Sequence, residues 1–286
     1  MAEVTDSPDA PSNKKAFIPL ENNPEVMSSL LHKLGLSTAL SFHDVFSIED
    51  PSLLSFIPRP ALALLLVFPV SKSYEQFRVT EDKEREDYNG KGEGEPVIWY
   101  KQTIRNACGL IGLLHAVSNG AARGFVEQGT DLDKLIKDAI PLPAGDRADL
   151  LYNSQPLESA HQSAATQGQS STPNAEDDID LHYVCFVKDE KNNLWEMDGR
   201  RRGPLELGAL GGDEDVLSEK ALNWGVRKFL KREEENGAEL RFSLIALAPS
   251  IYRSERDTGV ALLEHQTSSR RIVVTGHPHP DISHSY

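Results

Sequence analysis

One stretch of the chain, residues 102–116, joins a polar approach to an apolar run rich in small residues. It reads QTIRNACGLIGLLHA, and Cys108 stands at the junction of the two halves. Apolar positions after Cys108 recur at helical spacing, which predicts a buried helix with Asn106 as its N-cap. A thiol in the first turn meets free N–H groups and the positive end of the helix dipole, which favour a thiolate. The alternative is a buried cysteine that packs as a small hydrophobic residue.

A histidine and an aspartate stand in strand-like runs far downstream of the cysteine. Alternation and β-branching over 181–187 predict a strand, and Asn192 begins a turn to a return strand that ends at Asp198. In such a hairpin, Asp198 can lie beside His182 and fix the imidazole tautomer. Taken alone, His182 fits a core histidine and Asp198 fits a turn residue. Paired with Cys108, His182 can generate a thiolate and later protonate a leaving amine.

Gln102 precedes Cys108 on the approach to the predicted helix. Its side-chain amide and the backbone N–H of Cys108 could together stabilise an oxyanion, although, taken alone, a solvated glutamine fits the local pattern better. His115 lies two helical turns from the thiol, so we interpret it as a packing or capping residue. We expect Cys185 to lie in the core. The histidines lack metal-ligand spacing, and no nucleotide-binding motif occurs, so we predict neither a metal nor a cofactor.

Composition limits the partners and the location of the protein. A net charge of −14 over 286 residues argues against nucleic acid as the main partner and suits a cationic protein or peptide. Two cysteines make no disulfide framework. The N-terminal residues lack an apolar signal-peptide core, and the most apolar run, 61–70, is shorter than the ~20 residues of a membrane span. We therefore predict a monomer in the cytoplasm, with a possible nuclear pool, and no membrane partner.

The pattern along the chain predicts one domain at 16–248 between poorly ordered tails at 1–15 and 249–286. Asn23 and Gly35 are the predicted caps of the first helix. The predicted helices are 24–34, 51–56, 108–117, 130–139, 146–152 and 215–234, and the predicted strands are 41–47, 61–68, 181–187, 194–198 and 240–247. Loops are expected at 81–95, with some helix, and at 199–212. The polar segment 154–178 has little to bury, and a loop of this length is usually functional or disordered.

These residues together resemble the ubiquitin carboxyl-terminal hydrolases, peptidase family C12, and most of all the small isozymes. The resemblance extends over about 17–248. It is carried by the nucleophile signature at 102–112, the histidine strand at 180–183, the aspartate strand at 194–200, and further blocks at 19–24, 57–60 and 239–242. Arg105, Arg201 and Arg202 depart from the pattern by adding cations near the expected site.

The resemblance implies an α/β (α+β) fold of the papain-like cysteine protease type, with a central, mostly antiparallel sheet flanked by helices and a knotted backbone. It implies four catalytic roles: Cys108 as nucleophile, His182 as general base and acid, Asp198 as the residue that orients the histidine, and Gln102 as oxyanion stabiliser. Segment 154–178 would be an active-site crossover loop. Such a loop limits access, so that small or flexible adducts are cleaved best.

The resemblance also implies ubiquitin as substrate, with a related modifier of the Nedd8 type as an alternative. The expected reaction is hydrolysis of ester, thioester or amide bonds at the C-terminal glycine of ubiquitin, in ubiquitin recycling and ubiquitin-dependent protein catabolism. Two segments match ubiquitin-contacting surfaces of the family: Pro19, Leu20, Glu21, Asn22, Asn23 and Pro24, and Glu239, Leu240, Arg241, Phe242, Ser243 and Leu244.

Electrostatics adds one hypothesis about that substrate. Glu176, Asp177 and Asp178 could attract the arginines in the C-terminal tail of ubiquitin. Two rival functions stay open. One is a catalytically weak module that only binds ubiquitin, and the other is a papain-like peptidase with different substrates.

Overall fold

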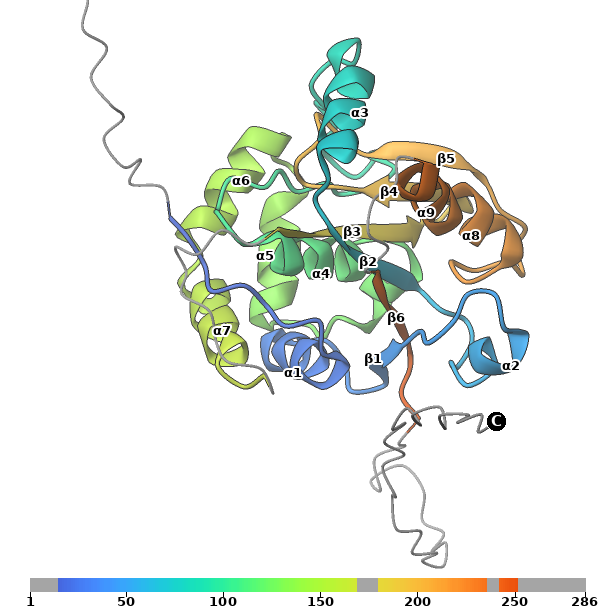
Figure 1. The fold of residues 1–286 in the computed structure, drawn as a ribbon. Helices are drawn as coiled ribbons and strands as arrows, with labels where there is room; N and C mark the ends of the chain where they lie inside the picture. Colours follow the sequence, from blue (N-terminus) through green and yellow to red (C-terminus); the bar gives the residue numbers. More distant parts are fainter. Residues whose placement is uncertain (1–14, 169–179, 236–241, 252–286) are drawn as a thin grey trace, which may run out of the picture. The chain divides into compact units, whose positions relative to one another are not determined.

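A six-stranded sheet forms the centre of the protein in the computed structural model, which describes residues 15–168, 180–235 and 242–251 (Figure 1). Its strands lie in the order β1-β6-β2-β3-β4-β5, and every neighbouring pair is antiparallel. The last of the described strands therefore lies inside the sheet, between β1 and β2. The strands are β1 (Leu40–Asp44), β2 (Ala63–Pro69), β3 (Leu181–Lys188), β4 (Asn193–Met197), β5 (Leu205–Ala209) and β6 (Ser243–Pro249).

Helices cover both faces of the sheet (Figure 1). They are α1 (Pro24–Leu34), α2 (Pro51–Leu54), α3 (Lys72–Lys83), α4 (Cys108–Ser118), α5 (Asp131–Ala139), α6 (Ala144–Asn153), α7 (Gln155–Ala165), α8 (Glu219–Trp224) and α9 (Val226–Glu235), with a 3-10 helix at Gly120–Phe125. Alternate residues of β2 point to opposite faces, as a strand buried on both sides requires. One face packs against α1 and α4–α7, and the other against α8, α9 and Tyr74 of α3.

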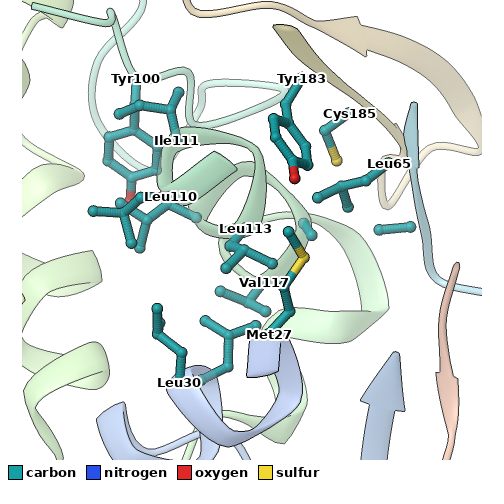
Figure 2. Packing of buried hydrophobic residues seen from close by; sticks show 14 of the residues in the cluster. Met27, Leu30, Leu65, Tyr100, Leu110, Ile111, Leu113, Val117, Tyr183 and Cys185 are labelled. Atoms are coloured by element: carbon teal, nitrogen blue, oxygen red, sulfur yellow. The ribbon is translucent and has the colours of Figure 1, made fainter. Parts of the chain in front are cut away.

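The larger core joins α4 to α1 and to the sheet. Figure 2 shows Met27 and Leu30 of α1 beside Leu113 and Val117 of α4. Capping fixes the ends of α1 as predicted. The Asn23 side chain accepts hydrogen bonds from the N–H groups of Glu25 and Val26, and Gly35 has the positive φ of 118° that ends the helix.

The prediction of a loop over 154–178 is wrong for its first half, which forms α7. Ser154 caps this helix, and its buried face consists mainly of Leu157 and alanines. Such a small-residue face gives only a weak apolar periodicity, so the sequence pattern of residues 155–165 does not predict a helix. Residues 169–179, with Glu176, Asp177 and Asp178, lie outside the described residues.

Three further expectations need correction. Residues 199–212 contain a strand, β5, which pairs with β4. The single helix predicted over 215–234 is two helices that meet at Gly225, where a Cβ would come within 2.9 Å of a Phe186 ring atom. The helix at Cys108 has Ala107, not Asn106, at its N-cap position, because Asn106 adopts a left-handed φ of 57°. The tails predicted at 1–15 and 249–286 lie almost wholly outside the described residues, and the knotted backbone stays a prediction.

Candidate active site

Cys108 is the first residue of α4, and its half-buried thiol faces the start of β3. The sulfur lies 4.0 Å from the carbonyl oxygen of Leu181, the residue before His182. Two glycines in α4 allow this approach. A Cβ on Gly112 would lie 3.4 Å from a Leu65 side-chain atom, and one on Gly109 would lie 3.3 Å from Leu20 Cβ. The small residues of the nucleophile signature thus bring the helix close to the sheet.

His182 and Asp198 meet across the predicted hairpin and form a buried ion pair. Nε2 of His182 lies 2.7 Å from Oδ1 of Asp198, and their exposed fractions are 2% and 0%. Burial alone would lower the pKa of His182, but the Asp198 carboxylate and hydrogen bonding to Asp198 and Cys108 raise it from 6.5 to about 9. The imidazole is therefore held as an imidazolium beside the thiol.

Asp198 has further donors around it that the sequence pattern did not indicate. The Tyr74 hydroxyl donates to Oδ2 at 2.6 Å, and the Arg200 backbone N–H donates to Oδ1 at 2.9 Å. Burial alone would raise the pKa of the Asp198 carboxyl, but the charge of His182 and these hydrogen bonds hold it well below its usual range. Trp99 Nε1 also donates to the Asp198 backbone carbonyl at 3.1 Å. Asp198 is therefore an ionised carboxylate in a fixed orientation.

Gln102 lies beside the segment that carries the aspartate. Its backbone N–H donates to the Gly199 carbonyl at 2.8 Å. Its side-chain Nε2 donates to the Ile104 carbonyl at 3.3 Å, while Oε1 is buried without a partner among the described residues. The structure thus gathers the four predicted catalytic residues where α4, β3 and β4 begin or end.

The two segments predicted to contact substrate touch each other. Asn22 Nδ2 donates to Ser243 Oγ at 2.5 Å and joins the two segments directly. The first segment is also held by β3, because the Tyr183 hydroxyl donates to the Leu20 carbonyl at 3.1 Å. Phe242 stacks on Phe68 with ring centroids 6.4 Å apart. The second segment is described only for Phe242, Ser243 and Leu244, because Glu239, Leu240 and Arg241 lie outside the described residues.

The residues set aside in the sequence have structural places. His115 is fully buried and accepts a hydrogen bond from the Tyr100 N–H at 2.9 Å, and burial lowers its pKa to about 3. Cys185 lies in the core, where burial raises the pKa of its thiol. Arg201 is buried in ion pairs with Glu196 and Asp82. The burial of His115 and of Cys185 therefore agrees with the packing roles predicted for them.

The described part of the chain offers neither a cluster of metal ligands nor a membrane-spanning helix. No group of three or more His, Cys, Asp or Glu side chains there is arranged to hold a metal ion. Among the same residues, no helix combines the length and the apolar character that a membrane span requires.

A half-buried thiol at a helix start, beside a buried histidine–aspartate pair, defines a cysteine hydrolase of the thiol protease type. The model of family 1 of the ubiquitin carboxyl-terminal hydrolases matches residues 17–231. The chain belongs to this family and is a cysteine-type deubiquitinase, which confirms the predicted family.

Relatives and a solved structure agree with the assignment. Ubiquitin carboxyl-terminal hydrolase 3 of Arabidopsis thaliana is 36% identical over 239 residues, covering 83% of this chain and 96% of that protein. The Saccharomyces cerevisiae hydrolase YUH1 is 32% identical over 242 residues, covering 82% and 97%. The Trichinella spiralis UCH37 catalytic domain, solved with ubiquitin vinyl methyl ester, has a TM-score of 0.62 at 20% identity and covers 82% and 95%. This likeness and the antiparallel sheet confirm the predicted fold class.

Proposed function

We propose that this protein hydrolyses ester, thioester or amide bonds at the C-terminal glycine of ubiquitin, with Cys108 as the nucleophile. The observation that carries the proposal is the buried His182–Asp198 pair, 2.7 Å apart, with the Cys108 sulfur 4.0 Å from the carbonyl oxygen of Leu181, the residue before His182. A protonated histidine beside a cysteine favours the thiolate, the form of the thiol that attacks carbonyl carbon.

The reaction follows from these positions. The Cys108 thiolate attacks the glycine carbonyl carbon, and the resulting oxyanion accepts hydrogen bonds from the Gln102 side-chain amide and the Cys108 backbone N–H. When the intermediate collapses, the bond to the leaving group breaks and His182 gives that group a proton. A thioester between Cys108 and ubiquitin remains.

Water completes the reaction. His182, now neutral, takes a proton from the attacking water, and a second oxyanion forms in the same place. Its collapse breaks the C–S bond to Cys108 and releases the glycine as a carboxylic acid, which loses its proton to solvent, and the thiolate–imidazolium pair is restored. Asp198 keeps the imidazole oriented through both halves of the reaction. Loss of the Gln102 amide should lower kcat by roughly 10² to 10³, as loss of one oxyanion donor does elsewhere.

Ubiquitin would be bound by the joined surface of residues 19–24 and 242–244. The bond from Asn22 to Ser243 supports this, because it makes the two segments one continuous surface. The buried side chain of Leu20 also lies directly against α4 at Gly109, so the first segment adjoins the helix that carries the thiol. A Nedd8-type modifier is the alternative substrate, and a panel of modifier probes would distinguish the two.

The preference for small or flexible adducts is part of the proposal. The described ends of the predicted crossover loop support it, because α7 is fixed to residue 18 by a 2.7 Å contact between His161 Nε2 and the Ile18 carbonyl, and β3 begins one residue before His182. Residues 169–179 lie outside the described residues, and the crossover loop that the family resemblance implies there would limit the size of the leaving group. Ubiquitin joined to a short peptide should therefore be cleaved faster than ubiquitin joined to a folded domain, and equal rates would remove this preference.

The charge of the protein bears on its proposed partner. The net charge of −14 suits attraction of a cationic ubiquitin tail, and we propose a cytoplasmic and nuclear monomer. Neutralising Glu176, Asp177 and Asp178 should weaken ubiquitin binding at low salt, where exposed charges are least screened. An unchanged dissociation constant would refute that role for the three residues.

Release of a fluorophore from a ubiquitin C-terminal amide tests the function. Wild-type protein should release it, and Cys108→Ala should not. Wild-type protein that binds ubiquitin without releasing the fluorophore would favour the rival, a catalytically weak binding module.

A further inference from the structure

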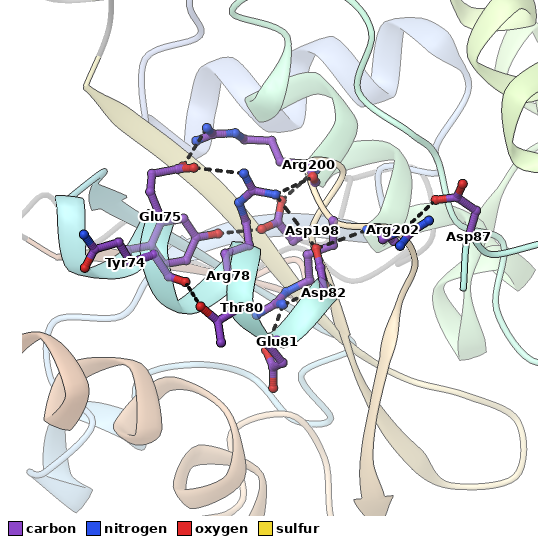
Figure 3. Close-up of polar contacts among 12 residues, drawn as sticks. Tyr74, Glu75, Arg78, Thr80, Glu81, Asp82, Asp87, Asp198, Arg200 and Arg202 are labelled. Atoms are coloured by element: carbon purple, nitrogen blue, oxygen red, sulfur yellow. Dashed lines mark hydrogen bonds and ion pairs between the residues drawn. The ribbon is translucent and has the colours of Figure 1, made fainter. Parts of the chain in front are cut away.

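Tyr74 of α3 lies entirely buried against the far oxygen of Asp198. Its hydroxyl donates to Oδ2 at 2.6 Å, whereas Oδ1 lies 2.7 Å from His182 Nε2. The carboxylate thus uses one oxygen for the histidine and the other for the tyrosine. Figure 3 shows the bond between Tyr74 and Asp198. We propose that Tyr74 is a positioning residue for the hydrolase reaction, whose hydroxyl fixes the Asp198 carboxylate so that Oδ1 faces His182. This inference rests on the proposed function.

The tyrosine ring is itself firmly held. Its centroid lies 4.7 Å from that of Phe68 and 6.1 Å from that of Phe229. The guanidinium of Arg232 stands over the ring at 5.5 Å. Because these contacts involve the ring and not the hydroxyl, a phenylalanine at position 74 would keep them. Removal of the hydroxyl alone therefore isolates its bond to Asp198.

Arginines after Asp198 tie α3 to the catalytic segment. Arg78 Nη1 donates to the Arg200 carbonyl at 2.9 Å, and Arg200 Nη2 lies 2.6 Å from Glu75 Oε1. Arg201 adds a buried contact to Asp82 at 3.2 Å. Figure 3 shows these contacts as a network between α3 and the residues beside Asp198. The helix and the aspartate are thereby joined at several points, which fixes the Tyr74 hydroxyl relative to the carboxylate.

The chemical state of both groups suits this role. Burial and the negative charge of Asp198 raise the pKa of Tyr74 far above its ordinary value, so the hydroxyl keeps its proton and donates throughout the working range. A carboxylate oxygen left without a donor in a buried place loses a strong, charge-assisted hydrogen bond. The carboxylate could then turn, and the histidine would lose its fixed orientation.

Tyr74→Phe tests the proposal in the full-length enzyme, with Tyr100→Phe as a matched control. Tyr100 is equally buried, but its hydroxyl pairs with Ser118 Oγ at 3.0 Å. We expect Tyr74→Phe to lower kcat about tenfold on a ubiquitin C-terminal fluorophore substrate, and this tenfold loss corresponds to about 1.4 kcal/mol of activation free energy. KM should stay within about twofold of the wild-type value. Tyr100→Phe should leave both constants near the wild-type values. If Tyr74→Phe has the kcat of Tyr100→Phe, the proposal is wrong.

A double-mutant cycle separates positioning from a general structural effect. If Tyr74 acts through the carboxylate, Tyr74→Phe should cause no further loss of kcat in an Asp198→Asn background. Independent losses that multiply in the double variant would overturn the proposal. The same experiment keeps the two claims distinct, because an inactive wild-type enzyme refutes the proposed function, whereas an active wild type with an additive cycle refutes only the role of Tyr74.

Discussion

Two buried side chains, His182 and Asp198, carry most of the site's electrostatics. The imidazolium raises the stability of the carboxylate, and the carboxylate raises that of the imidazolium, so each pKa moves away from neutrality. The pairing of His182 with Asp198 could be predicted from the sequence because both lie in one hairpin. Tyr74 could not be predicted, because it is 124 residues from Asp198 and stands in a mostly polar helix.

The raised pKa of His182 predicts a loss of stability at alkaline pH. A group whose pKa rises on folding, here from 6.5 to about 9, contributes its full stability below 6.5 and loses it as the pH rises through about 9. The free energy of unfolding, measured by urea denaturation, should therefore fall across this window. His182→Gln should lack that part of the fall. Parallel pH dependence in the two proteins would contradict the assigned charge state.

At the scale of the elements, the site depends on close approach of backbones. A Cβ on Gly199 would lie 2.8 Å from an Ile111 methyl carbon of α4 and 3.1 Å from Gln102 Cβ. Gly199 follows Asp198 directly, and its carbonyl accepts the backbone hydrogen bond of Gln102. A displacement of Gly199 would therefore move both Asp198 and Gln102. The position requires a residue without a side chain because the space is already filled.

Gly199→Ala should therefore impair both stability and catalysis. Overpacking of this kind typically costs about 1–3 kcal/mol of unfolding free energy, and we expect kcat to fall with it. Gly212→Ala is the control, because a Cβ there meets no atom within 4 Å. Denaturant titration and fluorophore release measure the two effects. If both variants have the unfolding free energy and the kcat of the wild type, the close packing around Gly199 contributes to neither stability nor catalysis.

Elements were predictable where their signals are local. The caps at Asn23 and Gly35, the continuous apolar run of β2 and the alternation in β3 are signals that lie within a few residues, and these elements form as expected. The helices α3 and α7 were not predictable, because distant contacts stabilise them. In α7, His161 bonds to the Ile18 carbonyl, 143 residues away in the chain. A window of sequence carries no sign of such a partner.

On the scale of the whole molecule, Arg147 of α6 connects the end of α5 to the segment that precedes the nucleophile helix. Its side chain is fully buried, donates to the Ala139 carbonyl at 2.8 Å and pairs with the buried side chain of Glu95. Glu95 precedes the segment that leads to Gln102 and Cys108. The pair thereby links α5 and α6 to the approach of the nucleophile helix.

Arg147→Met should destabilise the protein by about 3–5 kcal/mol, because it leaves the Glu95 carboxylate buried without its cation. Lys137→Met is the control, since Lys137 forms an exposed pair with Asp133 on the surface and such pairs contribute little. Urea denaturation compares the two variants. Equal midpoints would show that the buried pair does not hold these regions together.

Covalent capture by a ubiquitin C-terminal electrophile tests the central claim, that Cys108 is the activated nucleophile for ubiquitin. The chain has two cysteines, and Cys185 is a built-in control because it lies fully buried in the core. Intact-mass measurement and peptide mapping should show one ubiquitin on Cys108 and none on Cys185, with no adduct in Cys108→Ala. An adduct on Cys185, an adduct that survives in Cys108→Ala, or no adduct on the folded wild-type protein would contradict the account.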